Sequence, residues 1–191
     1  AGTISDWGVP YEVFRVYTPG NYPNTPYTNS LILNKKVFVP QTGHPNDADA
    51  LAAYEEAMPG YEVFGVMYDG WVNTDALHCR TKGIVDIGML HIDHMPLLGN
   101  IQLEDNYNIV ASFTNYSGNS LYSDSLLMYF RTDGGNYQEV QMTQQIGNVY
   151  FATIPYQEEG TVVAYYIYAA DESGRSSMHP LIGAPDPHEF T

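Results

Sequence analysis

The residue best suited to covalent chemistry in this sequence is Cys79, which lies in the stretch WVNTDALHCRTK, residues 71–82. It is the only cysteine in the 191 residues, so it cannot form a disulfide within the chain. The thiolate is the nucleophilic form of cysteine, and nearby positive charge favours it. Arg80 and Lys82, two of only seven basic residues, stand beside Cys79 among polar, turn-forming neighbours. Two interpretations stay open, a reactive cysteine on a loop and an inert, buried one.

Histidine could supply a base or a metal ligand at several places in the chain. His78 directly precedes Cys79, but in an extended segment adjacent side chains point to opposite faces, so we expect His78 to be structural. His91 and His94 lie in a strand-like stretch, 88–95, where they also face opposite ways. Because nothing nearby completes a ligand set, we expect no metal and no other cofactor. His179 and His188 lie in a Pro-rich tail and indicate no function.

The segments before Cys79 have the pattern of a β/α unit. YEVFRV at 11–16 returns fifty positions later as YEVFGV at 61–66, and both runs have the residue types of strands. Between them the sequence predicts strands at 30–34 and 37–39 with a turn at Lys35 and Lys36, then a helix at 48–58 with Asn46 as its N-cap. This period is within the range of repeat architectures, so the region reads as the end of a larger repetitive β/α structure. Chance recurrence of the motif is the alternative.

From about Pro96 the helical pattern ends and short alternating strands follow at regular spacing. We predict strands at 107–114, 125–132, 137–142, 149–154 and 161–169, separated by turns such as Asp133-Gly134-Gly135. This spacing is typical of a small antiparallel β-sandwich, here without the disulfide of antibody domains. The run 163–175, a strand entering an Asp-bearing turn, resembles the last strands of immunoglobulin-like modules.

Composition and charge exclude several classes of protein. With 44% hydrophobic and 15% charged residues, the chain is not an intrinsically disordered segment. Its net charge of −15 excludes an ordinary nucleic-acid-binding surface, which is basic. No apolar run approaches the ~18 residues of a membrane span. The chain starts Ala1-Gly2-Thr3, without an initiator Met or a signal peptide, so we expect a processed or excised piece of a longer protein.

Three motifs of the first half resemble one enzyme family. YTNSLILN (27–34), AMPGYE (57–62) and TDALHCRT (74–81) are similar to the C-terminal part of a bacterial, Porphyromonas-type peptidylarginine deiminase, a member of the guanidine-modifying superfamily of agmatine and arginine deiminases. AADESGR (169–175) and IGAPDP (182–187) resemble its immunoglobulin-like module. The resemblance implies an α+β fold in which residues 1–96 are the C-terminal part of the pentein catalytic domain, with the last ββαβ blade of a β/α propeller. Residues 97–191 are then an immunoglobulin-like antiparallel β-sandwich.

The same resemblance implies roles for individual residues. Cys79 attacks the guanidinium carbon of arginine, ammonia leaves, and water resolves the thiouronium to give citrulline. Thr74 lines the active site, and Asn29 belongs to the framework of the substrate-binding site. The pair Lys82-Gly83 departs from the His-acidic pair expected there.

The general acid/base histidine and the carboxylates that hold a guanidinium are expected in earlier blades, and nothing in this chain matches them. We therefore expect a fragment that is inactive alone and whose partners are the missing N-terminal part and an arginine-containing peptide or small guanidino substrate. A secreted, cell-surface or periplasmic bacterial location is expected. The alternatives are a non-catalytic binding or adhesion module, and a degenerate paralogue that keeps the cysteine without activity.

Overall fold

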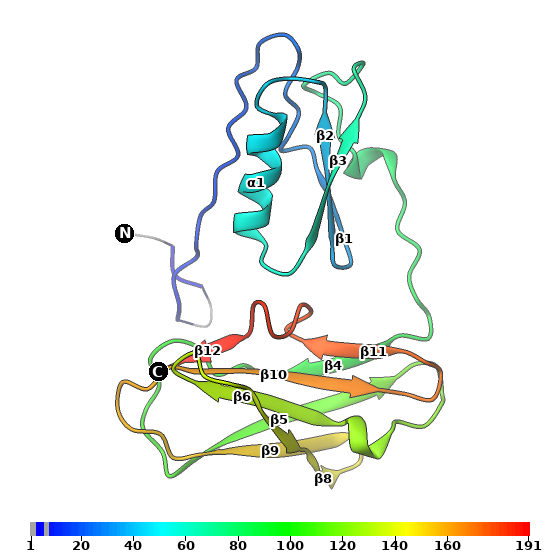
Figure 1. The fold of residues 1–191 in the computed structure, drawn as a ribbon. Coiled ribbons are helices and arrows are strands. Elements are labelled where there is room, and N and C mark those ends of the chain that lie inside the picture. Colours follow the sequence, from blue (N-terminus) through cyan, green and yellow to red (C-terminus); the bar gives the residue numbers. More distant parts are fainter. Residues whose placement is uncertain (1–2, 6–7) are drawn as a thin grey trace. The chain divides into compact units, whose positions relative to one another are not determined.

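The chain forms two compact units in a computed structural model that describes residues 3–5 and 8–191. Glu12–Val85 form one unit, here called the helix-containing unit. Asp86–Thr191, with the described residues up to Tyr11, form the other, here called the two-sheet unit. The described residues form a mostly β structure with one short α-helix, which is consistent with the expected α+β class (Figure 1). In the described part of the chain, no helix has the length and apolar character needed to cross a membrane.

In the helix-containing unit, a three-stranded sheet of order β1–β2–β3 packs against helix α1 (Figure 1). Its elements are β1 (Leu31–Leu33), β2 (Lys36–Gln41), α1 (Asp47–Ala57) and β3 (Glu62–Met67), followed by the short 3-10 helix η1 (His78–Arg80). β1 and β2 are antiparallel, whereas β2 and β3 are parallel and are connected through α1. The predicted hairpin, helix and second YEVF strand are thus confirmed.

The β1–β2 turn lies one residue earlier than predicted. Leu33 pairs with Lys36, so the turn consists of Asn34 and Lys35. Asn34 has a φ of 54°, in the left-handed region that asparagine tolerates better than most residues. The polar side chain of asparagine therefore decides the position of this turn.

The core of this unit ties the loop before β1 to the helix. Tyr27, Val37, Val39 and Ala50 are its buried residues. The hydroxyl of Tyr27 donates to Asp47 Oδ1 at the start of α1, at 2.8 Å, and burial together with this carboxylate raises the pKa of Tyr27 above its ordinary value. The backbone just ahead of Asn29 is thereby fixed to α1.

The first copy of the YEVF motif is not a strand. Residues 11–16 have no regular secondary structure, and Pro10 makes only an isolated bridge with Ile4. A strand needs a neighbouring strand to take up its backbone hydrogen bonds, and no described strand pairs with this segment. Tyr11 and Val13 are 61% and 70% exposed. The strand prediction for this segment is therefore wrong, and only the second copy supports the β/α interpretation.

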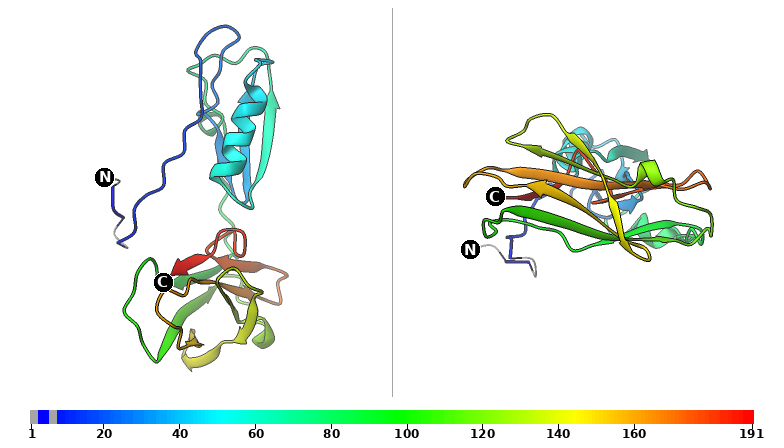
Figure 2. Two further views of the ribbon diagram at one scale, coloured as in Figure 1. Left: turned by 60° about the vertical axis from the view of Figure 1, so that its left-hand side comes forward. Right: turned by 90° about the horizontal axis from the view of Figure 1, so that it is seen from below.

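In the two-sheet unit, two antiparallel sheets form two layers, as the view from below in Figure 2 shows. One sheet has the order β4–β5–β9–β8, and the other has the order β11–β10–β6–β7 with β12 also paired to β10. The first sheet consists of β4 (Leu90–His94), β5 (Asn106–Asn115), β8 (Thr143–Ile146) and β9 (Val149–Pro155). The second consists of β6 (Leu127–Thr132), β7 (Gln138–Gln141), β10 (Val163–Ala170), β11 (Ser176–His179) and β12 (His188–Phe190).

The core of the two-sheet unit lies between the layers and alternates along each strand. Along β5, Tyr107, Ile109, Ala111 and Phe113 are buried while the residues between them face outward. This period of two is what the sequence predicted for a sheet with one buried face.

The structure differs from the expected organisation at both ends of this unit. β4 pairs with β5, so it belongs to the two-sheet unit although it lies ahead of the expected boundary at residue 97. The compact units divide between Val85 and Asp86. The five predicted strands are present, but β8, β11 and β12 were not predicted.

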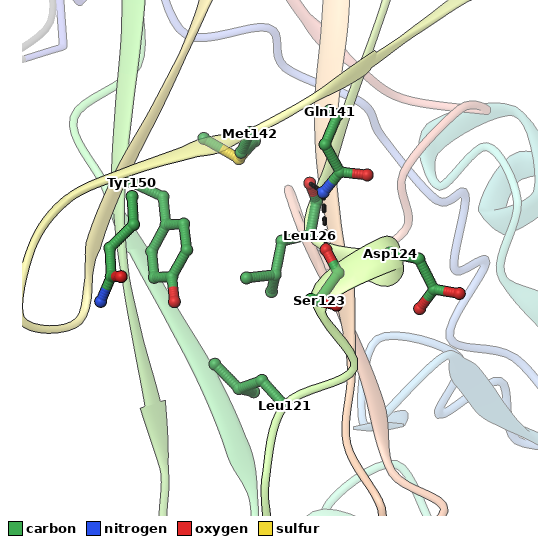
Figure 3. A pocket seen from close by; sticks show the side chains of 8 residues that line it. Leu121, Ser123, Asp124, Leu126, Gln141, Met142 and Tyr150 are labelled. Carbon is green, nitrogen blue, oxygen red and sulfur yellow. Dashed lines mark hydrogen bonds between the residues drawn. The ribbon is translucent and has the colours of Figure 1, made fainter.

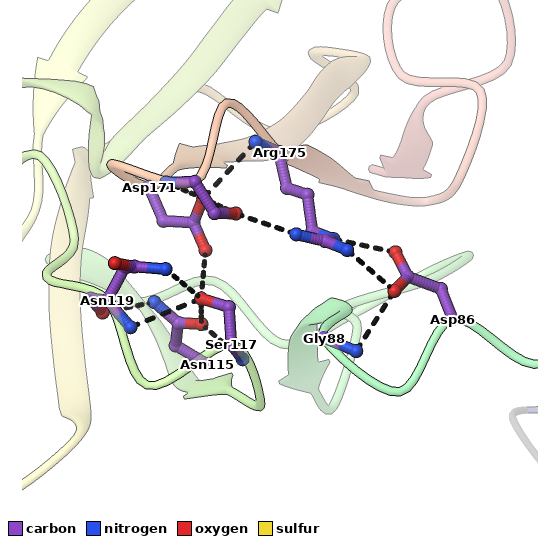
Figure 4. Close-up of polar contacts among 8 residues, drawn as sticks. Asp86, Gly88, Asn115, Ser117, Asn119, Asp171 and Arg175 are labelled. Atoms are coloured by element: carbon purple, nitrogen blue, oxygen red, sulfur yellow. Dashed lines mark hydrogen bonds and ion pairs between the residues drawn. The ribbon is translucent and has the colours of Figure 1, made fainter.

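The Asp-bearing turn after β10 is held by a polar network, shown in Figure 4. The buried Asp171 accepts hydrogen bonds from the backbone N–H groups of Ser173 and Arg175 and from the hydroxyl of Ser117. Arg175 in turn donates through Nε and Nη2 to the two carboxylate oxygens of Asp86, at 2.7 and 2.9 Å. The bidentate pair fixes the first residues of the two-sheet unit to the β10–β11 turn.

Candidate active site

Cys79 lies on an exposed loop of the helix-containing unit, after β3, and its thiol is free. It is the middle residue of η1, whose turn is closed by two backbone hydrogen bonds. Cys79 N–H donates to the carbonyl of Ala76 at 3.1 Å, and Arg80 N–H donates to the carbonyl of Leu77 at 3.0 Å. The thiol is accessible to a reagent or a substrate, so the expectation of a buried cysteine is wrong.

His78 contacts the cysteine, contrary to expectation. Its Nδ1 lies 3.3 Å from the Sγ of Cys79. The expectation assumed an extended segment, but residues 78–80 form a 3-10 turn. In such a turn adjacent side chains are about 120° apart and can approach each other. The ring is therefore placed to exchange a proton with the thiol.

Asp75 and Arg80 close the loop that carries the cysteine. Arg80 Nη2 lies 2.5 Å from Asp75 Oδ1, and Asp75 Oδ2 accepts the N–H of Val72 at 3.2 Å. The hydrogen bond from Arg80, and then that from Val72, holds the pKa of Asp75 below its ordinary value. Arg80 also lies over the ring of Trp71, 5.8 Å from its centroid. The charge of Arg80 is thus compensated by Asp75, which weakens the effect on the sulfur that the sequence suggested.

Asn29 holds the same loop from the side of β1. Its Nδ2 donates to the carbonyls of Asn73, at 2.9 Å, and Asp75, at 2.5 Å, and its own carbonyl accepts the N–H of Leu77 at 2.9 Å. Both amide hydrogens of the side chain are therefore directed to the loop backbone. This geometry gives Asn29 a framework role, because its side chain fixes the path of the residues that lead to Cys79.

Thr74 is exposed and lies between the two carbonyls that Asn29 binds. The structure thus places all three predicted site residues, Asn29, Thr74 and Cys79, on one loop and its support. Thr74 follows Val72 and Asn73 in the turn that Asp75 closes, since Asp75 N–H donates to the carbonyl of Val72 at 2.9 Å.

Further polar residues that support this loop were missed in the sequence. Asn24 Nδ2 donates to the carbonyl of Trp71 at 3.0 Å, and the N–H of Thr25 donates to Asn73 Oδ1 at 2.8 Å. The indole of Trp71 donates to the carbonyl of Val66 in β3 at 3.1 Å. The sequence signal for this support was Asn24 and Asn73, which lie in turn-rich stretches. Asparagine side chains often bind backbone groups in turns.

The loop supplies a nucleophile and a possible base but no free clamp for a cation. The carboxylate of Asp75 is engaged by Arg80 and by a backbone N–H, so it does not offer the paired acceptor that a guanidinium needs. Over the residues that the structure describes, no three His, Cys, Asp or Glu side chains form a group that could hold a metal ion. The residue of this loop that is suited to covalent chemistry is Cys79, whose thiol is free and exposed.

A hollow of about 530 Å³ opens in the two-sheet unit, where the chain passes from β7 in one sheet to β8 in the other (Figure 3). Gln141 lies at its edge and donates to the carbonyls of Ser123 and Leu126, at 2.7 and 2.9 Å. The residues that line the hollow are Leu121, Ser123, Asp124, Leu126, Gln141, Met142, Gln144 and Tyr150. This lining includes neither a cysteine nor a histidine, so the hollow offers no counterpart to the Cys79 loop.

Residues 3–84 match the family model described as Porphyromonas-type peptidyl-arginine deiminase. The match includes Asn29, Thr74 and Cys79, and it confirms the resemblance that the motifs at 27–34, 57–62 and 74–81 indicated. The motifs at 169–175 and 182–187 lie outside the matched residues. The likeness of the two-sheet unit to an immunoglobulin-like module therefore stays a prediction.

Proposed function

Because residues 3–84 match the family model of Porphyromonas-type peptidyl-arginine deiminases, we propose that the helix-containing unit carries the nucleophile of a hydrolase that converts arginine, free or within a peptide, to citrulline and ammonia. The observation that carries the proposal is the position of Cys79 inside the matched region, on an exposed loop held from several sides. A rigidly positioned, accessible thiol is what covalent attack on a planar guanidinium needs.

In the proposed reaction, the thiolate of Cys79 forms a bond to the guanidinium carbon, and the carbon–nitrogen bond to one terminal nitrogen breaks. That nitrogen leaves as ammonia after taking up a proton, and a thiouronium remains on the sulfur. Water then adds to the same carbon, the carbon–sulfur bond breaks, and citrulline and the cysteine are released. His78 is placed to take the thiol proton at the start, because its Nδ1 lies 3.3 Å from the sulfur. Thr74 and Asn29 contribute the wall and the framework of the substrate site.

The proposed site is incomplete within residues 1–191. The carboxylates that hold the guanidinium, and the acid that protonates the leaving ammonia, come from an N-terminal part of the same enzyme. The helix-containing unit then serves as the last blade of a pentein propeller, and the two-sheet unit as an immunoglobulin-like appendage. The enzyme is secreted, at the cell surface or periplasmic, and residues 1–191 alone have no turnover.

Selective labelling tests this proposal. A haloacetamidine, which carries a planar cation like that of arginine, is compared with the neutral haloacetamide of the same size. We expect both to label Cys79 on the isolated chain with little preference, because the clamp is absent. When the N-terminal part is supplied, the rate of labelling by the haloacetamidine should rise at least about tenfold over that by the haloacetamide. Citrulline should then form from arginine. Cys79→Ser is the control and should abolish both signals.

Two outcomes would count against an enzyme. If the complete protein shows no preference for the cationic reagent and forms no citrulline, the chain is a binding module or a degenerate paralogue. The two-sheet unit has a separate core and the hollow of Figure 3, which makes a binding module the second candidate. If residues 86–191 still bind a ligand of the complete protein after the helix-containing unit is deleted, the binding module is favoured.

A further inference from the structure

Three histidines from three strands meet at one edge of the two-sheet unit, away from the Cys79 loop in the sequence. They are His94 on β4, His179 on β11 and His188 on β12. The ring of His94 has its centroid 5.5 Å from that of His179 and 5.7 Å from that of His188, and the last two centroids are 5.0 Å apart. Neither the proposed reaction nor the sequence assigns any role to this histidine cluster.

The cluster lies where the last strand of the chain is interrupted. β11 and β12 both pair with β10 on the same edge, antiparallel to it. His179 is opposite Ile167 and His188 is opposite Tyr165, so the two short strands follow one another along β10 and meet at the two histidines. There, His179 Nδ1 lies 2.9 Å from His188 Nε2. This hydrogen bond joins the two strands across the interruption.

Such a bond exists only while one ring has a proton and the other a lone pair at the shared contact. If both rings are protonated, two N–H groups and two positive charges face each other at this distance. His94 is constrained in a similar way. The carbonyl of Val110 can only accept, so Nδ1 of His94 donates to it at 2.7 Å, and Nε2 accepts from the hydroxyl of Tyr165 at 2.9 Å. A second proton on His94 would force the hydroxyl of Tyr165, whose oxygen already accepts the N–H of Leu97 at 2.8 Å, to turn its own proton away.

The groups around the cluster give it little compensation for positive charge. Burial lowers the pKa of all three histidines, that of His188 to about 3. On β4, Asp93 raises the pKa of His94 and of His179, whereas His91 lowers that of His179. On β10 the facing titratable group is Tyr165, whose pKa burial raises further above its ordinary value, and on β5 the contact is a backbone carbonyl. The folded unit therefore favours the neutral form of these rings.

We propose that the attachment of β11 and β12 to β10 depends on pH through the histidine cluster: as the pH falls, these two strands detach while the sheet β4–β5–β9–β8 stays folded. The direction follows from the preference of the folded unit for neutral rings. The detached segment takes up protons more readily, so the attachment is complete above the ordinary histidine value of about 6.5 and weakens as the pH drops below it. The C-terminal strands thus form an acid-releasable edge of the unit.

Hydrogen exchange on the full chain tests the proposal. After correction for the intrinsic rate, the amides of β11 and β12 should lose at least about tenfold of their protection between about pH 7 and about pH 5, while those of β5 and β9 keep theirs. Equal loss in all four strands, or no loss in β11 and β12, would overturn it. Both results are read from the unsubstituted protein.

A paired substitution tests the role of the rings. In the double variant His179→Gln and His188→Gln, the two amides can still hydrogen-bond to each other but do not titrate in this range. The loss of protection in β11 and β12 at lower pH should then become several-fold smaller, because of the three rings only His94 is left to titrate. The matched control is His44→Gln, which removes a histidine of the helix-containing unit and should leave the loss unchanged. Persistence of the full loss in the double variant would contradict the proposal.

Discussion

His78 Nδ1 and Cys79 Sγ lie 3.3 Å apart, although the two residues are adjacent in the chain. The contact exists because residues 78–80 turn in a 3-10 helix instead of extending. It places the single cysteine of the 191 residues beside a ring nitrogen that can exchange a proton with the sulfur.

Replacement of this ring should therefore slow the reactions of the thiol. In His78→Phe, which keeps a flat ring without nitrogen, we expect alkylation of Cys79 by a neutral haloacetamide near neutral pH to fall roughly three- to tenfold. The rate is measured by mass spectrometry of the labelled peptide. His91→Phe, on an exposed position of β4, is the control. An unchanged rate in His78→Phe would mean that the contact does not influence the sulfur.

Asn29 should be required for the shape of the nucleophile loop. Asn29→Asp keeps the size of the side chain but replaces both donated hydrogens by an anionic oxygen that faces the carbonyls of Asn73 and Asp75. We expect the amides of residues 73–79 to exchange faster by about tenfold, since a lost hydrogen bond of this kind costs about 1 kcal/mol. Asn21→Asp, at an exposed position of the same unit, should have no such effect.

The Asp75–Arg80 pair should protect the chain at Arg80. Asp75→Asn removes the charge that holds the guanidinium, so tryptic cleavage after Arg80 should become faster than in the parent protein. Asp69→Asn, an exposed acid of the same unit, is the matched control and should leave the cleavage rate as it is. Equal cleavage in Asp75→Asn and the parent would show that the pair does not restrain the loop.

The pair also has a defined pH dependence. Because the hydrogen bond from Arg80 lowers the pKa of Asp75, the folded loop favours the ionised carboxylate. The contribution of the pair is present above the ordinary aspartate value of about 3.9 and is lost as the pH falls through the lowered value. NMR signals of the Arg80 side chain should therefore stay constant down to about pH 4 and shift only below it.

The sequence predicted the parts of this protein that depend on local pattern. Alternation along β5 and the composition of α1 and its neighbours each indicated the element that the structure contains. The strand at 11–16 failed because its residue types allow a strand but no described strand lies beside it to complete one. Strand propensity describes a fit to a sheet, and the sheet depends on tertiary contacts.

The candidate site shows the same limit. Cys79 was singled out by its residue type, and Thr74 and Asn29 by the family resemblance alone. The contact of His78 with the sulfur was rejected because an extended backbone was assumed. The histidine cluster could not be found, since His94 is far in sequence from His179 and His188 and no periodic pattern links them. Prolines around the last strands also hid their strand character.

The last prediction concerns the buried hydrogen bond from Tyr27 to Asp47, which joins the segment just before Asn29 to the start of α1. Tyr27 is fully buried, and its hydroxyl donates to Asp47 Oδ1 at 2.8 Å, while Asp47 Oδ2 accepts the N–H of Gly43 at 2.8 Å. Tyr27→Phe keeps the ring but leaves one carboxylate oxygen without this partner. Since a hydrogen bond to a charged group contributes about 1.5–3 kcal/mol, we expect the free energy of unfolding of the helix-containing unit to fall by about that amount.

Urea denaturation in a Trp7→Phe background, where Trp71 is the single tryptophan, reports the change through the fluorescence of Trp71, which lies in this unit and is buried. Tyr22→Phe is the matched control, because that hydroxyl belongs to a side chain that is 88% exposed and should contribute almost nothing. Tyr27 lies two residues before Asn29, so loosening it should also raise the exchange of the Leu77 amide that Asn29 binds. A loss of stability without faster exchange of the Leu77 amide would show that this part of the core does not influence the position of Cys79.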